Sequence, residues 1–230
     1  EPSSLGGGGG GGDASVHEQD ECVVFHHKGA ITGLQIAGRQ LVSSSVDGTC
    51  RVWDLVKDRC ERIIDVGESV TTCACSPEDV PLGTSRYLAT GTESGGVSIF
   101  SMNSWKEVLS FKAHDGPVSC MWSDGQKVLV TGGEDGFVKV WDMMEGRQGP
   151  GSLSIKAHNA PVASLQADGT KIVSGGRDGA VRVWSKETGQ GILEVAGHTA
   201  FLGSVQFEGH RLVTDGTNNV VVCHDFSNNP

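Results

Sequence analysis

Residues 129–142 read LVTGGEDGFVKVWD, and the chain of 230 residues returns to this pattern four more times. The related segments are 41–54 (LVSSSVDGTCRVWD), 88–100 (LATGTESGGVSIF), 172–184 (IVSGGRDGAVRVW) and 212–225 (LVTDGTNNVVVCHD). The positions that close them are Trp53, Phe100, Trp141, Trp184 and His224, so the period is about 40 to 47 residues. A recurrence of this length indicates a row of small structural units that stack on one another.

Each repeat reads as two short strands around a tight turn. Within 130–140, apolar and polar residues alternate on both sides of Asp135-Gly136, and glycine accepts the positive φ that such a turn needs. Another apolar alternation precedes the pair, as in 117–122 (PVSCMW), and a fourth follows it, as in 191–195 (GILEV). Each unit is therefore predicted to be a four-stranded antiparallel sheet, and the fold to be all-β.

The Trp-Asp closings, upstream histidines and Asp-Gly turns at fixed offsets make the chain resemble the WD40-repeat family, over about residues 21–226. The resemblance implies a WD40 β-propeller of four-stranded antiparallel blades, with five WD units in this chain. Two alternatives remain for the ring: a self-contained five-bladed propeller, or the C-terminal part of a seven-bladed parent. The chain begins with Glu1 rather than Met, which slightly favours the longer parent.

We expect two parts along the chain. Residues 1–20, with a glycine run at 6–12 and acidic neighbours, are typical of a flexible linker. Residues 21–230 form the propeller, in units of about 26–65, 66–112, 113–156, 157–196 and 197–226. Because the last unit has no residues left for a fourth strand, we expect 21–25 (ECVVF) to complete that blade and close the ring.

The resemblance also implies a buried, hydrogen-bonded tetrad in each well-formed unit. The matching residues are His27, Ser43, Asp47 and Trp53 in unit one, His114, Thr131, Asp135 and Trp141 in unit three, and His158, Ser174, Asp178 and Trp184 in unit four. A hydroxyl, an imidazole and a carboxylate together could instead form a hydrolase triad. An active site has no reason to recur in three units of a ring, so we expect a structural role, no catalytic residue and no enzyme.

Units two and five depart from the tetrad pattern. Their replacements are Val66, Ser94 and Phe100 in unit two, and Asn218 and His224 in unit five. We expect these two blades to rely on apolar packing where the others use hydrogen bonds.

The charge balance argues against nucleic acid as a partner. The formal net charge is −10, and residues 1–22 carry five acidic residues with no Lys or Arg. Proteins that bind nucleic acid usually present a basic surface to neutralise phosphates. No apolar run approaches the roughly 20 residues that a membrane helix needs. We therefore expect no direct binding of nucleic acid and no membrane insertion.

The seven cysteines are an odd number, and several lie in apolar, strand-like runs. Buried free thiols fit a reducing compartment, so we expect an intracellular protein, cytoplasmic or nuclear. Cys73 and Cys75 form a C-x-C pair that could bind a metal, but no matching pair lies nearby in the sequence. Strand alternation places both on one buried face. We expect no metal and no cofactor.

Candidate partner-binding residues fall on both faces of the predicted ring. On the face of the Asp-Gly turns, we expect Glu93, Glu134 and Arg177 to point outward, with Phe201 as the one bulky apolar residue near the rim. The rhythm of 164–173 is similar to F-box-associated WD proteins that read phosphodegrons, but one Arg among acidic residues argues against phosphate capture. A second set, five past each His position, is small and neutral: Thr32, Thr71, Ser119, Ala163 and Gly203.

The opposite face carries the longest connections, 76–86 and 143–152. Trp105 lies on the same side, in place of the usual turn glycine, and we expect it to be an exposed hot spot for a partner.

Taken together, the sequence favours a non-catalytic scaffold for protein–protein interactions, and a subunit of a larger hetero-complex. One alternative is a substrate-recognition adaptor of the F-box or another ubiquitin-ligase type, which would need a further domain. Another is an enzymatic or sugar-binding propeller, which would need a central metal or carboxylate cluster. The sequence shows no repeated inward carboxylate beyond the tetrads.

Overall fold

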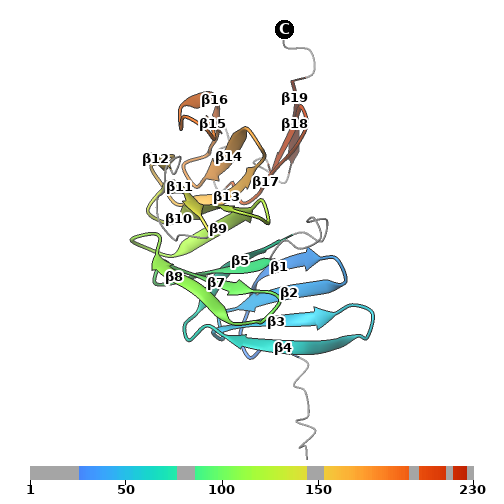
Figure 1. Cartoon of the computed structure of the whole chain (residues 1–230). Coiled ribbons are helices and arrows are strands. Elements are labelled where there is room, and N and C mark those ends of the chain that lie inside the picture. The colour runs from blue at the N-terminus through green and yellow to red at the C-terminus, as the bar shows by residue number, and fades with distance from the viewer. Residues whose placement is uncertain (1–25, 77–85, 144–152, 197–201, 216–219, 227–230) are drawn as a thin grey trace, which may run out of the picture.

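A computed structural model describes residues 26–76, 86–143, 153–196, 202–215 and 220–226. Within these ranges the chain forms 19 strands and no helix. The strands build five antiparallel sheets that follow one another in sequence order (Figure 1). Each of the first four sheets contains four strands, and the fifth contains three. The predicted all-β fold of four-stranded antiparallel blades is therefore confirmed.

The strands of each sheet are neighbours in the order in which the chain forms them. The first sheet contains β1 (Ile31–Ala37), β2 (Gln40–Ser45), β3 (Thr49–Asp54) and β4 (Arg59–Asp65). The second contains β5 (Val70–Cys75), β6 (Tyr87–Thr92), β7 (Gly96–Ser101) and β8 (Glu107–Lys112). The third contains β9 (Val118–Ser123), β10 (Val128–Gly133), β11 (Phe137–Asp142) and β12 (Ser154–Lys156). The fourth contains β13 (Val162–Ala167), β14 (Lys171–Gly176), β15 (Ala180–Ser185) and β16 (Gly191–Ala196), and the fifth contains β17 (Val205–Glu208), β18 (Arg211–Asp215) and β19 (Val221–Asp225).

The turn between the second and third strands of a sheet needs glycine for two reasons. Gly136 has a φ of 76°, which is the left-handed region. A Cβ at this position would lie 2.4 Å from the carbonyl oxygen of His158. The backbone N–H of His158 donates to the Gly136 carbonyl at 3.0 Å, so the turn of one sheet also anchors the start of the next unit.

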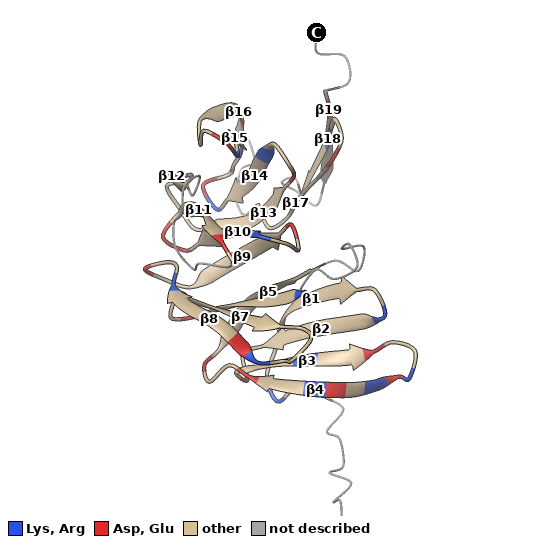
Figure 2. Ribbon diagram, in the orientation of Figure 1, with Lys and Arg blue, Asp and Glu red and all other residues tan. Residues whose placement is uncertain are grey.

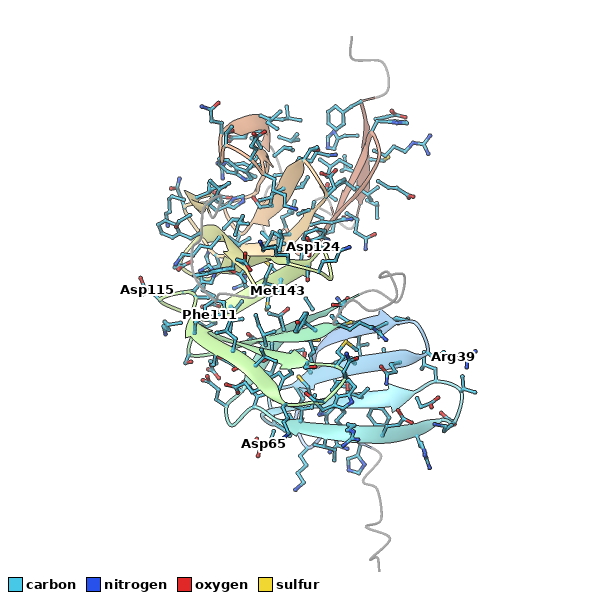
Figure 3. All side chains as sticks on the ribbon, viewed as in Figure 1. Arg39, Asp65, Phe111, Asp115, Asp124 and Met143 are labelled. Atoms are coloured by element: carbon cyan, nitrogen blue, oxygen red, sulfur yellow. The ribbon has the colours of Figure 1, made fainter. Side chains whose placement is uncertain are left out.

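Consecutive sheets pack face to face through apolar side chains. Between the first and second sheets, for example, Val42 and Val52 meet Val70, Leu88 and Phe100. Figure 3 labels Phe111 of β8 and Met143, which follows β11, two residues of the cluster between the second and third sheets. Three further clusters of this kind follow the first along the chain, so the core is divided among the junctions between sheets.

The first strand of each sheet (β1, β5, β9 or β13, here called the innermost strand) begins with a residue that is equivalent from sheet to sheet. From the second sheet on, this residue packs against the preceding sheet. Val70, Val118 and Val162 begin β5, β9 and β13, and each is completely buried. Ile31 is the equivalent residue of β1, since a β-bulge follows Ile31 in β1 as it follows Val70 in β5. In contrast to Val70, Ile31 has 56% of its surface exposed. No described sheet lies against this face, because the first sheet and the fifth sheet stand at opposite ends of the row (Figure 1).

The described strands thus form a row whose first and fifth sheets do not meet (Figure 1). The five-bladed ring and the seven-bladed parent both stay predictions. Residues 1–20 and the predicted closing strand 21–25 lie outside the described residues, so these two expectations remain predictions. The same holds for most of the two long connections, whose residues 77–85 and 144–152 are outside the described ranges.

Side-chain hydroxyl groups form hydrogen bonds between the innermost strands of neighbouring sheets. Thr32 donates to the Val70 carbonyl at 2.8 Å, and Thr71 donates to the Val118 carbonyl at 2.5 Å. Ser119 repeats the bond one sheet further on, to the carbonyl of Val162. A side-chain hydroxyl of one sheet therefore satisfies a carbonyl at the start of the next sheet, at three successive junctions.

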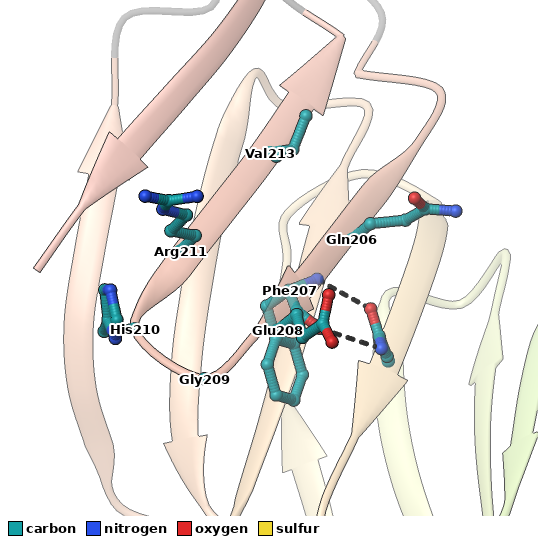
Figure 4. A pocket seen from close by; sticks show the side chains of 8 residues that line it. Gln206, Phe207, Glu208, Gly209, His210, Arg211 and Val213 are labelled. Carbon is teal, nitrogen blue, oxygen red and sulfur yellow. Dashed lines mark hydrogen bonds between the residues drawn. The ribbon is translucent and has the colours of Figure 1, made fainter.

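The junction between the fourth and fifth sheets uses a different device, because Ala163 has no hydroxyl. The Gln166 side chain bonds both backbone groups of Phe207: its Oε1 accepts from the N–H at 2.7 Å, and its Nε2 donates to the carbonyl at 3.1 Å (Figure 4). Ser164 adds a bond, accepting from the backbone N–H of Val205 at 3.1 Å.

Replacement of Thr71 by Val tests the hydrogen bond from the Thr71 hydroxyl to the Val118 carbonyl. Val keeps the branched shape but cannot donate to Val118, so we expect Thr71→Val to lower the free energy of unfolding by about 1 kcal/mol. Urea unfolding at pH 7 measures the change. Thr71→Ser keeps the hydroxyl and is the matched control. Equal stability of the Val variant and the wild type would show that the bond contributes nothing.

Candidate functional site

The third unit brings its four predicted tetrad residues together. Asp135 lies with both carboxylate oxygens 3.0 Å from Nδ1 of His114, and Nε2 of the same imidazole is 2.8 Å from the Thr131 hydroxyl. The indole N–H of Trp141 donates to that hydroxyl at 2.9 Å. Since the ionised Asp135 carboxylate can only accept, the proton of the neutral imidazole lies on Nδ1, and Nε2 accepts from the Thr131 hydroxyl.

The first and fourth units repeat this chain of bonds. In the fourth, His158 lies 2.9 Å from Asp178 and 2.9 Å from the Ser174 hydroxyl, to which Trp184 donates at 3.0 Å. In the first, the corresponding three distances are 3.1, 2.7 and 2.9 Å, among His27, Asp47, Ser43 and Trp53. All twelve predicted tetrad residues thus meet within their own units.

Burial sets the protonation of these groups. It lowers the pKa of His114 and of His158 below the ordinary value, although the neighbouring aspartates act in the opposite direction. Burial alone would raise the pKa of Asp178, but hydrogen bonds from Arg182 and His158 outweigh it and lower that pKa to about 2. A neutral imidazole beside an ionised carboxylate is therefore the stable state at neutral pH.

The order of hydroxyl, imidazole and carboxylate matches that of a hydrolase triad, but the geometry does not suit attack on a substrate. Thr131 and Ser174 are completely buried, and the side chains of His114 and His158 have no exposed surface. The indole N–H also occupies an acceptor site of each hydroxyl. What this arrangement does is satisfy polar groups between packed sheets.

Units two and five meet the expectation of altered tetrads in different ways. In unit two, Phe100 is buried in the first cluster, Thr90 donates to the Ser98 carbonyl at 3.3 Å, and Ser94 donates to Glu68 at 2.9 Å. In unit five, His198 and Asn218 lie outside the described residues. Nε2 of His224 is buried there without a hydrogen-bond partner.

The predicted partner-binding residues differ in how exposed they are in the structure. Glu93, Glu134 and Arg177 are exposed at the turns of three successive sheets, as expected of a binding face. Phe201 lies outside the described residues. Trp105 is partly buried and packs against the cluster between the first and second sheets, so the expectation of a freely exposed indole is wrong. Its φ of 56° places it in the left-handed turn position that Asp58 takes in the first sheet and Gly189 in the fourth, and its ring packs back onto the cluster.

The small neutral set proved to have a role that the sequence reasoning missed. Thr32, Thr71 and Ser119 were assigned to a binding face as neutral positions, whereas the structure uses their hydroxyls between sheets. The recurrence of a hydroxyl at one offset in three units was the available signal.

The described residues show neither a metal cluster nor a spanning helix. No three His, Cys, Asp or Glu residues among them gather as metal ligands would. Cys73 and Cys75 face the same buried cluster, and burial raises their pKa values to about 11 and about 12, so both stay protonated. Within the described ranges, no helix has the length and apolar character needed to cross a membrane. Figure 2 shows acidic and basic segments interspersed along β4 and the turns.

Removal of the central hydroxyl tests the structural role of a tetrad. Ser174→Ala leaves the Trp184 N–H and the His158 imidazole without their shared partner, so we expect a loss of about 1–3 kcal/mol in the free energy of unfolding. Ser174→Thr is the control, because Thr131 holds the same position in unit three. Chemical denaturation measures both, and a Thr variant as unstable as the Ala variant would contradict the role of the hydroxyl.

Acid should weaken the fold through the same residues. The folded-state pKa values of His114 and His158 are lowered, so the unfolded chain binds more protons below about pH 6.5. The Asp178 pKa is also lowered, from 3.8 to about 2, so its contribution is lost as the pH falls from about 4 to about 2. We expect the urea midpoint to decrease steadily from pH 7.5 to pH 5, and further below pH 4. A constant or rising midpoint over the first interval would contradict the burial of neutral imidazoles.

Comparison with known proteins agrees with this geometry. A family model for the WD domain, G-beta repeat, matches residues 20–54, 105–142 and 151–185. Each matched segment contains the second and third strands of a described sheet, or ends with them. All three matches end directly after the closing tryptophan of the repeat, which is Trp53, Trp141 or Trp184.

Several curated proteins are similar to part of the chain. Mitochondrial division protein 1 of Neosartorya fischeri is 31% identical over 126 residues, which cover 46% of this chain and 19% of that protein. Shk1 kinase-binding protein 15 of Schizosaccharomyces pombe is 29% identical, over 54% of this chain and 36% of its own length. The p21-activated protein kinase-interacting protein 1-like of Danio rerio is 27% identical, over 51% and 42% respectively.

The chain spans less than half the length of each of these relatives. The matched repeats, the blade-like sheets and the buried tetrads nevertheless agree with one another: this chain contains WD40 repeats.

Proposed function

We propose that this chain is a non-catalytic scaffold for protein–protein interactions and works as a subunit of a larger intracellular complex. The observation that carries the proposal is an apolar sheet face without a described neighbour. We define the first-sheet face as Ile31, Leu34, Ile36 and Ile63, which are 56%, 58%, 68% and 53% exposed. Apolar patches of this kind mark sites where proteins associate.

The other sheets show what such a face is built to do. Leu34 lies opposite the tetrad hydroxyl of its sheet, and the residues in the same register of the other sheets are Cys73, Met121, Leu165 and Val205. All four are buried against a preceding sheet. The first-sheet face thus has the design of a packing surface and lacks a described partner.

The other end of the row presents a second uncovered face. Val221 is 71% exposed, whereas the residues in its register, Val97, Val138 and Val181, are completely buried. A hollow of about 980 Å³ lies on this side of the fifth sheet, lined in part by Gln206, Glu208 and Val213 (Figure 4). Two open faces at the ends of one row of packed sheets suit a protein that holds neighbours on both sides.

The names of the relatives support the same class of role. Two of them are described as a kinase-binding and a kinase-interacting protein, which are binding functions rather than catalysis. The free, buried cysteines of the described part also fit an intracellular, reducing setting. An adaptor for substrate recognition is the alternative. It is less well supported, because the turn position that carries Arg177 in the fourth sheet carries Glu134 and Glu93 in the two preceding sheets, which is not a basic cluster.

A paired substitution on the first-sheet face tests the scaffold role. We expect the double change Leu34→Glu and Ile36→Glu to reduce capture of specific partners from native extract by about 10-fold or more, because charge cannot be buried in an apolar contact. Tagged chains and quantitative mass spectrometry measure this, followed by direct binding of each purified partner.

Val56→Glu is the matched control, since Val56 is 69% exposed in the connection after β3, away from the first-sheet face. Circular dichroism and urea unfolding should show that all three chains are folded. If the double variant and the control bind the same proteins in the same amounts, the first-sheet face is not the interaction surface.

A further inference from the structure

An apolar slot opens between the fourth and fifth sheets. Its volume is about 210 Å³. The fourth sheet contributes Val173, Val183, Ile192 and Leu193, and the fifth contributes Phe207, Leu212 and Phe226. Aliphatic and aromatic side chains on both walls give the slot the character of a core that is incompletely filled.

The corresponding space between the second and third sheets is filled by an indole. Ala89, Ile99 and Leu109 lie side by side across the second sheet, in the register that Val173, Val183 and Leu193 have across the fourth. Against the second sheet packs Trp141, whose ring centroid is 4.7 Å from that of Phe111. At this junction, an aromatic ring of the following sheet therefore packs against the apolar row formed by Ala89, Ile99 and Leu109.

At the junction with the fifth sheet, the residue in the Trp141 position is His224. The equivalence follows from pairing, since Trp141 lies opposite Leu129 and His224 lies opposite Leu212, which lines the slot. An imidazole is smaller than an indole, and His224 stacks beside Phe226, with centroids 6.3 Å apart. The replacement of indole by imidazole leaves room for a ring that none of the described residues supplies.

The titratable residues at the mouth of the slot are basic, and the two that are Lys and Arg have acidic partners that a ligand would have to replace: Lys171 pairs with Asp168, and Arg211 with Asp225. The titratable side chains that line it are Lys171, His210 and Arg211, and none of the lining residues is acidic. His210 and Arg211 lie at the turn that leads into β18 and are more than half exposed (Figure 4). Their contacts with Asp225, at 3.7 and 3.5 Å, are exposed ion pairs of the weak kind that a ligand carboxylate can replace.

We propose that this slot binds an aromatic side chain of a partner protein, from a segment with acidic residues next to the aromatic one. The ring enters between Val183 and Phe207, and the flanking carboxylates meet Lys171 and Arg211. The inference rests on the proposed scaffold role and adds the chemistry of one partner segment. It uses a different surface from the first-sheet face.

Synthetic peptides and the full chain test the slot directly. The probe is acetyl-Glu-Glu-Trp-Glu-Glu-amide, and the comparison peptides replace Trp by Ala or every Glu by Lys. Isothermal titration gives the affinities, and ¹H–¹⁵N spectra of the labelled chain locate the site. We expect each comparison peptide to bind at least about 10-fold more weakly, and the shifts to centre on Val183, Leu193 and Phe207.

A matched pair of variants separates the slot from a general surface effect. Ile192→Glu adds a negative charge to the wall of the slot and should weaken the Trp peptide about 10-fold or more. Val108→Glu makes the same change at the corresponding position of the second sheet, where Trp141 already fills the space, and should leave binding unchanged.

Absence of binding to the wild type, equal binding of the Lys peptide, or equal loss in both variants would overturn the proposal. These outcomes leave the scaffold role intact, because that role is tested by the Leu34 and Ile36 substitutions on the first-sheet face.

Discussion

Face-to-face burial between consecutive sheets is the interaction on which the rest of this structure depends. An antiparallel sheet has two faces, and apolar residues on both must be covered for the chain to gain from burial. Here each interior sheet is covered on one face by its predecessor and on the other by its successor, through a separate apolar cluster. Stability is therefore distributed along the row, and the two end sheets are each left with one face that the described chain does not cover.

Two recurring hydrogen-bond arrangements satisfy the polar groups that are buried inside this stack of sheets. The tetrads join the second and third strands of a sheet, and the turn between them, to the residues that precede its first strand. The Thr and Ser hydroxyls join the first strand of one sheet to the first strand of the next. Both arrangements place a hydroxyl where it can satisfy groups that would otherwise be buried unpaired, which is costly. The same logic explains why a set of residues resembling a hydrolase triad has a structural role in this chain.

The second and fifth units, which lack the tetrad tryptophan, pack differently from the other units at the junctions between sheets. In the second unit, a buried phenylalanine replaces the indole, and the space remains packed. In the fifth, His224 replaces it, the imidazole keeps an unpaired buried nitrogen, and an apolar slot remains open beside its neighbour Leu212. Together with the first-sheet face, this leaves more than one apolar surface that the described residues do not cover, and the proposed scaffold role rests on these surfaces.

The repeat period, the four-stranded units, the glycine turns and the three tetrads could all be read from the sequence, because each depends on residues at fixed offsets within about 40 positions. The sequence did not reveal that Trp105 packs against the first cluster, that Thr32, Thr71 and Ser119 hold the sheets together, or that the first sheet keeps an exposed face. These features depend on which sheet lies against which, and on whether a neighbouring side chain fills the space between them. A local pattern fixes the two faces of a strand, whereas only the tertiary packing decides which of those faces is covered.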